Sequence, residues 1–197
     1  MEELIHKWIS KLTIFGKYIE FRIIENKTSS HHIRNSYSEV VYYILLNYKN
    51  NDIDYYEAEK SVNHKFPQDL KKVMNENFFR IEDEDGNIYT GLFHVGLLNN
   101  SIQIEQIKNP ESIYTKEEIH LIHNGFSIGK SHSYDDSVIF IAYNTSGDPM
   151  LGIHNHDDLF YHLEPYTLDA LLALLDKDLE EFLEKIIEGF EDDEIVF

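Results

Sequence analysis

Cysteine is absent from the 197-residue chain. Its absence excludes disulfides, thiol catalysis and thiolate metal sites, and it is consistent with a reducing compartment. The N-terminal stretch MEELIHKWIS also lacks the basic segment and the following apolar run of a secretory signal. No apolar run approaches the roughly 20 residues that a membrane-spanning helix needs. We therefore expect a cytoplasmic protein without a membrane span.

Basic residues are scarce in the second part of the chain. Residues 1–80 hold 12 Lys and Arg against 11 Asp and Glu, whereas residues 81–197 hold 5 against 25. The formal net charge of −19 is therefore concentrated beyond residue 80. Because such a field repels phosphates, we expect no binding of nucleic acid. The same field attracts a basic protein and speeds its encounter, although an acidic surface can also serve solubility alone.

Three common catalytic motifs are missing as well. The sequence has no P-loop, no G-x-G-x-x-G and no H-E-x-x-H pattern. The strongest metal candidate is the cluster of His154, His156 and Asp157, because two histidines at i and i+2 lie on the same side of a strand. Its composition is that of a polar turn. We therefore predict neither a metal site nor a cofactor, and a metal-dependent hydrolase built on this cluster is the least favoured alternative.

The spacing of apolar residues predicts several helices. The apolar residues Ile53, Tyr56, Ala58 and Val62, and then the stretch after Pro67, are typical of two short helices with a tight link, since proline is favoured at a helix start. A capping-box pattern begins at Thr115 and predicts another short helix. From Thr167, a continuous apolar stripe at helical spacing predicts a long closing helix that ends near Gly189.

Alternating or continuous apolar runs predict strands between these helices. They lie at residues 18–24, within 81–98 and within 137–163. Residues 37–48 are ambiguous, because their spacing fits a helix while their β-branched and aromatic content fits a strand; we favour a helix. The expected fold class is α+β, with an antiparallel sheet of about five or six strands, flanking helices and a long C-terminal helix.

The stretch Ile139–Ile153 predicts two strands joined by the turn NTSGDP. Gly147 supplies the positive φ that a tight hairpin requires. Asn144 and Asp148 bond locally to the turn backbone, and Pro149, which lacks an N–H, belongs at the start of a strand. The turn is therefore expected to be structural, although its acidic end can face a partner.

Two stretches carry a resemblance to a known family. They are DYYEAEKSVNHKFPQDLKKVMNEN at 54–77, with two helices joined at a proline, and the strands, Gly-Asp turn and final helix of 139–175. In this order the elements resemble the SUKH superfamily, which includes Smi/Knr-type regulators, Syd and many bacterial immunity proteins. The resemblance implies a SUKH-like core at 51–190 in a single domain of residues 1–197, with residues 1–50 as an N-terminal extension or lobe.

The resemblance implies a non-enzymatic binding protein. Many members of the family bind and neutralise a partner toxin, often a nuclease, and others act as regulatory scaffolds. The charge distribution agrees, because an acidic surface can occupy the basic cleft of a nuclease in place of phosphate. We therefore predict an immunity protein, monomeric or homodimeric, that binds a basic, nuclease-type toxin. A regulatory scaffold and a nucleic-acid-mimic inhibitor are the alternatives.

The predicted partner-binding surface combines acidic turns with tyrosines, which are enriched at binding hot spots. Its members are Glu82, Asp83, Glu84, Asp85, Asp148, Asp157, Asp158, Tyr55 and Tyr56.

Overall fold

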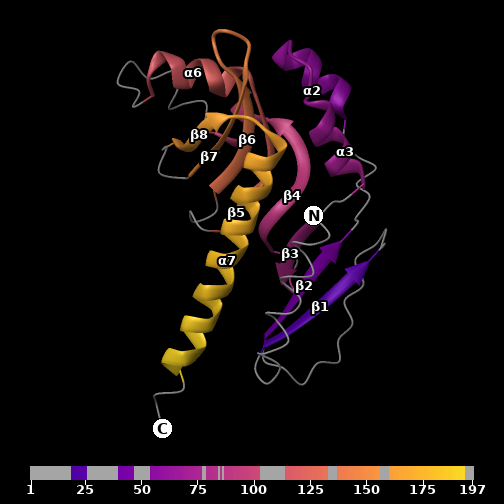
Figure 1. Cartoon of the computed structure of the whole chain (residues 1–197), viewed down its shortest axis with the longest axis vertical. Coiled ribbons are helices and arrows are strands. Elements are labelled where there is room, and N and C mark those ends of the chain that lie inside the picture. Colours follow the sequence, from indigo (N-terminus) through magenta and orange to yellow (C-terminus); the bar gives the residue numbers. More distant parts are fainter. Residues whose placement is uncertain are drawn as a thin grey trace.

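The computed structural model describes residues 19–25, 40–46, 54–76, 79–83, 85, 87–102, 114–132, 137–155 and 160–193. These residues form an α+β fold around one eight-stranded sheet whose strand order follows the chain (Figure 1). The strands are β1 (Ile19–Glu25), β2 (Val40–Leu46), β3 (Phe79–Asp83), β4 (Ile88–Leu97), β5 (Gly125–Ser131), β6 (Ser137–Tyr143), β7 (Pro149–His154) and β8 (Phe160–Pro165).

Strand direction divides the sheet into two parts. β1 pairs with β2 in parallel, while every later pair, from β2–β3 to β7–β8, is antiparallel. The first two strands thus belong to the same sheet as the rest, so that the described parts of residues 1–50 extend the sheet at one edge. β8 forms the opposite edge.

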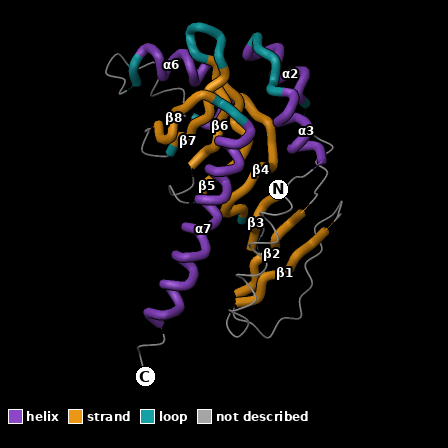
Figure 2. Tube along the Cα trace, viewed as in Figure 1, coloured by secondary structure: helices purple, strands orange, loops and turns teal. Residues whose placement is uncertain are grey.

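Helices lie on both faces of this sheet (Figure 2). Alternate residues of β6 enter two separate buried clusters, which shows that the strand is covered on both sides. One cluster joins the sheet to α2, α3 and α7, and the other joins it to α4 and α6. The helices are α2 (Tyr55–Val62), α3 (Gln68–Glu76), α4 (Leu98–Ser101), α6 (Lys116–His123) and α7 (Leu168–Asp193).

The predicted fold class is confirmed, with two local corrections. We expected a helix within residues 37–48, but residues 40–46 form β2, because pairing with strands on both sides suits their β-branched and aromatic side chains. This additional strand helps to bring the sheet to eight strands rather than five or six. The closing helix also does not end at Gly189, since α7 continues to Asp193.

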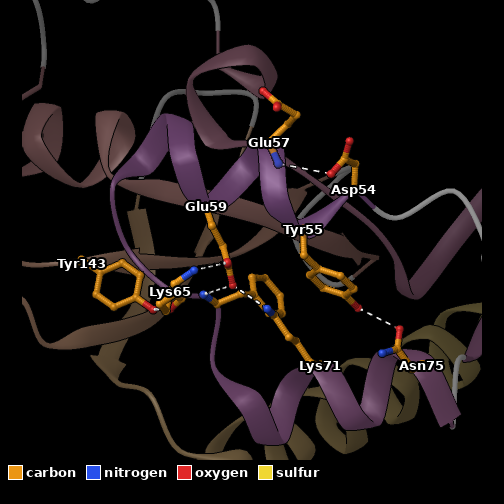
Figure 3. Close-up of polar contacts among 9 residues, drawn as sticks. Asp54, Tyr55, Glu57, Glu59, Lys65, Lys71, Asn75 and Tyr143 are labelled. Carbon is orange, nitrogen blue, oxygen red and sulfur yellow. Dashed lines mark hydrogen bonds and ion pairs between the residues drawn. The ribbon is translucent and has the colours of Figure 1, made fainter.

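The helix pair α2–α3 forms around a buried carboxylate (Figure 3). Asp54 caps α2 by accepting a hydrogen bond from the Glu57 N–H. Glu59 accepts from the Lys65 and Lys71 ammonium groups, at 3.0 and 2.5 Å, and from the Phe66 N–H at 3.0 Å. Burial alone would raise the pKa of Glu59, but these hydrogen bonds outweigh it and lower the pKa to about 2. The charged form of Glu59 therefore fixes the link between the two helices.

A buried aspartate attaches α7 to the sheet. α7 buries one stripe of apolar side chains, which includes Leu171, Leu175 and Phe182. Within this stripe the Asp178 side chain, only 3% exposed, accepts hydrogen bonds from the hydroxyls of Thr90 on β4 and Ser131 on β5. It also accepts from the His132 N–H at 3.2 Å. The carboxylate thus provides acceptors for donors that the helix would otherwise bury without partners.

The β6–β7 turn has the geometry that its sequence predicts. Gly147 has a φ of 85°, and Pro149 begins β7. The Asn144 carboxamide oxygen accepts from the Ser146 and Asp148 N–H groups, both at 2.9 Å. The neighbouring Tyr143 ring stacks on His64 in the α2–α3 link, with ring centroids 4.1 Å apart. The hairpin therefore packs against the helix pair.

Candidate partner-binding site

In the acidic turn after β3, one carboxylate accepts hydrogen bonds from other groups of the turn. Asp83 accepts hydrogen bonds from the N–H groups of Asp85 and Asn87, both at 2.9 Å, and from the Asn87 carboxamide and the Tyr89 hydroxyl. Burial would raise the pKa of Asp83, but these bonds outweigh it and lower the pKa. Asp83 is therefore a turn-forming residue, whereas Asp85 is exposed and Glu82 is half-buried. Glu84 lies outside the described residues.

Asp148 is exposed, but it lies far from that turn. The β3–β4 turn precedes Ile88, the first residue of β4, whereas the last residue of β4, Leu97, pairs with Phe126. That end of the sheet also carries the β6–β7 turn, because the adjacent Gly125 pairs with Ala142. The ten residues of β4 span about 30 Å, so the two acidic turns form separate surfaces. Asp157 and Asp158 lie outside the described residues.

The two tyrosines of α2 have different surroundings. Tyr55 is half-buried: its ring lies 5.2 Å from that of Phe66, and its hydroxyl donates to the Asn75 carboxamide oxygen. Burial raises the pKa of Tyr55 to about 12. Tyr56 is 68% exposed and is one of the two large apolar side chains exposed among the described residues. Of this pair, Tyr56 is therefore the side chain available to a partner.

A hollow between β8 and α7 adds residues that we did not predict. It has a volume of about 260 Å³. The strands contribute Ile153, His162 and Glu164, and α7 contributes Ala170, Ala173, Leu174, Lys177, Asp178 and Glu181. The helix residues recur at i, i+3 and i+4, so they form one face of α7 beside its buried stripe. Glu164 pairs with Leu151, which places its side chain on the face that α7 covers.

A bulge and small side chains create the space for this hollow. The β7–β8 register shifts between Leu151 and Ile153, and His162 has a φ of 50°. Such a bulge redirects side chains at a sheet edge. On the helix, Ala170 and Ala173 leave room where larger residues would fill it. The signal of the hollow in the sequence is these two alanines, which lie beside the leucine-rich stripe of the helix.

The charged residues around the hollow are mostly acidic. Glu164 is exposed on the strand side, and Glu181 lies on the helix side with its carboxylate 3.3 Å from the Lys177 ammonium. Asp178 directs its oxygens to Thr90 and Ser131, as described above. Glu164 and Glu181 are therefore the carboxylates suited to a ligand in a hollow that aliphatic side chains also line.

The histidine of the proposed metal cluster that the structure describes points into the core. His154 is 5% exposed, and its Nε2 lies 2.9 Å from the Tyr114 hydroxyl. The Phe160 ring packs edge-on against it at 4.9 Å between centroids. His156 and Asp157 lie outside the described residues. Within the described ranges, no group of three or more His, Asp or Glu side chains could hold a metal ion.

A buried serine on one strand also contacts a half-buried histidine on the neighbouring strand. His94 Nε2 on β4 lies 3.0 Å from the Ser127 hydroxyl on β5, and burial lowers the pKa of His94. A nucleophilic serine requires both a base and access for the substrate. Ser127 is 1% exposed, so the contact acts as a hydrogen bond within the sheet.

Comparisons with known proteins give no match: no family model, curated protein or solved structure is similar to this chain. The resemblance to the SUKH superfamily therefore stays a prediction from the sequence. In the part of the chain that the structure describes, no helix is long and apolar enough to cross a membrane.

Proposed function

We propose that this protein is a non-enzymatic binding module for a basic partner protein. The observation that carries this proposal is the charge separation along the chain, with 25 acidic against 5 basic residues beyond residue 80. These residues form β4 to β8 and α7, with part of β3, and thus most of the sheet and its closing helix. Acidic residues on this part, including Asp85, Asp148 and Glu164, are exposed.

The physical argument is electrostatic steering. Like charges on one body produce a field that accelerates the encounter with an oppositely charged protein and disfavours acidic partners. At physiological ionic strength this field is screened over about 8 Å, so close contact must supply the remaining affinity. Exposed side chains such as Tyr56 are suited to this contact, because tyrosine contributes large area and a polar group at interfaces.

More specifically, the partner that we propose is a nuclease-type toxin, with this chain acting as its immunity protein. Nucleases hold a polyanion and therefore present basic clefts, which an acidic protein surface can cover. The SUKH-like order of elements in the sequence supports this class. A regulatory scaffold would use the same attraction toward a different basic protein, so the identity of the partner distinguishes the two.

The test is binding to the product of the neighbouring gene. We expect the two purified proteins to form a complex in about 50 mM salt that weakens in about 500 mM salt, because screening removes the attraction. If the partner is a nuclease, the complex should also lose nuclease activity. A basic neighbour that shows no binding at low salt would contradict the proposal. Binding without inhibition would favour the scaffold.

A further inference from the structure

The hollow between β8 and α7 has the size of a site for one side chain. Its volume of about 260 Å³ lies below the range of roughly 300–1,000 Å³ typical of pockets for small-molecule ligands. It is open to solvent on the surface that also carries Glu164, an exposed residue. A side chain presented by another protein can therefore enter it without any rearrangement of the sheet.

The lining combines aliphatic side chains with carboxylates. Ile153, Ala170 and Leu174 offer aliphatic surface, which suits the methylene stem of a long side chain. Glu164 stands on the strand side and Glu181 on the helix side. A planar guanidinium can hydrogen-bond to carboxylates in two directions at once, whereas an ammonium acts as a point charge. The hollow therefore favours arginine over lysine.

The charge balance agrees with a cationic occupant. Three carboxylates line the hollow, against one ammonium, that of Lys177. The ion pair between Lys177 and Glu181 is 3.3 Å long, with side chains 58% and 35% exposed. Exposed pairs of this kind contribute little, because both groups remain hydrated. An incoming guanidinium can therefore displace Lys177 from Glu181 at small cost.

From these observations we infer that the β8–α7 hollow receives an arginine side chain of the basic partner, between Glu164 and Glu181. This inference rests on the proposed function, since it assigns an anchor point to the same partner. The inference is more specific than a general electrostatic attraction to the acidic turns, because it requires a concave site with two specific carboxylates. Arginine is enriched among the residues that dominate interface energies, and such anchors occupy pockets.

A peptide titration with matched controls tests the inference. The probe is acetyl-Gly-Arg-Gly-amide, followed by the amide NMR shifts of the uniformly ¹⁵N-labelled full chain, with the citrulline and lysine analogues as comparisons. We expect shifts at residues 162–164 and 170–181 with the arginine peptide, weaker shifts with lysine and none with citrulline. Equal shifts with all three peptides, or none in these residues, would overturn the inference.

Three variants separate the hollow from bulk charge. Glu164→Gln/Glu181→Gln should weaken arginine binding at least about tenfold, because it removes both carboxylates. Asp85→Asn/Asp148→Asn changes the net charge equally at exposed positions elsewhere and should retain the binding. Ala173→Phe fills the hollow at unchanged charge from an exposed helix position and should abolish it. Thermal melts check that each variant is folded.

The outcomes separate this inference from the proposed function. If both double variants lose binding equally, or if Ala173→Phe binds normally, the hollow is not the site, while a basic partner can still bind elsewhere. If the partner binds the Glu164→Gln/Glu181→Gln variant as tightly as the original protein, the inference also fails and the proposed function stands. If the arginine peptide occupies the hollow but no basic partner binds at low salt, the proposed function fails instead.

Discussion

Glu59 shows how a single residue can couple stability to pH. Its carboxylate is 8% exposed and lies against two ammonium groups and one backbone N–H. Since its pKa falls from the usual 4.5 to about 2 in the folded protein, the charged form is stabilised by folding. The contribution is fully present above about pH 4.5 and is lost as the pH falls toward 2.

Replacing Glu59 by Gln should remove this contribution. At pH 7 we expect a loss in the free energy of unfolding on the order of 3 kcal/mol, as the size of the pKa shift implies. Between pH 5 and about 2 the difference from the original protein should shrink, because both proteins then lack the charged carboxylate. Urea denaturation at a series of pH values measures it.

The control for this variant is Glu57→Gln. Glu57 lies on the same helix in an exposed pair with Lys60, at 3.9 Å, so its neutralisation should change stability by less than about 1 kcal/mol. A constant difference between the Glu59→Gln variant and the original protein across the whole pH range would contradict the role of the Glu59 charge.

Residue-level predictions succeeded where the reason for a residue is local. Gly147 and Asn144 shape their turn from within five positions of the chain, and Thr115 with Glu118 forms a capping box. The predicted role of Asp83 at a partner-binding surface stays a prediction, and the structure adds that its carboxylate accepts hydrogen bonds within the turn and from the Tyr89 hydroxyl. Nothing in the sequence indicated that Glu59 is buried and hydrogen-bonded, because the donors to its carboxylate lie 6 to 12 residues away.

At the scale of elements, the attachment of α7 depends on Asp178. This carboxylate joins the helix to both β4 and β5 through Thr90, Ser131 and His132. Asp178 lies three residues after Leu175 and four before Phe182, so helical spacing places it on the apolar face of α7. The sequence does not show which donors meet the carboxylate there, because they come from distant strands.

Asp178→Ala should therefore loosen the helix from the sheet. The change leaves the Thr90 and Ser131 hydroxyls buried without their acceptor, and we expect a loss of about 2 to 4 kcal/mol in the free energy of unfolding. The midpoint of urea denaturation measures the loss. Glu184→Ala, an exposed acid on the same helix, should have little effect. Equal losses in the two variants would show that Asp178 has no special role.

The wrong prediction for residues 40–46 also concerns a whole element. Their apolar residues fall at positions compatible with either period, while their β-branched and aromatic side chains suit a strand, and residues 40–46 pair with strands at both edges. The helices α2, α3 and α7 were predicted because each combines a start signal with a clear period. The number of strands was underestimated for a second reason as well, because β5, at residues 125–131, lies in no stretch for which we predicted a strand.

At the scale of the whole molecule, the net charge of −19 opposes compactness. Repulsion among exposed acids is screened by salt, whereas the apolar clusters on the two faces of the sheet are little affected. We therefore expect the melting temperature to rise by about 3 to 8 °C between low salt and roughly 0.3 M NaCl. A melting temperature that stays constant or falls would show that ion pairs outweigh the repulsion.

The match between strand order and chain order has a consequence for how the protein reaches its structure. Each strand from β2 onward pairs with the strand that precedes it in the chain. Each strand can therefore pair as soon as it has been synthesised. During synthesis on the ribosome the sheet can thus lengthen one strand at a time. α7 follows all eight strands in the chain, and its apolar stripe then covers strands that already stand in register.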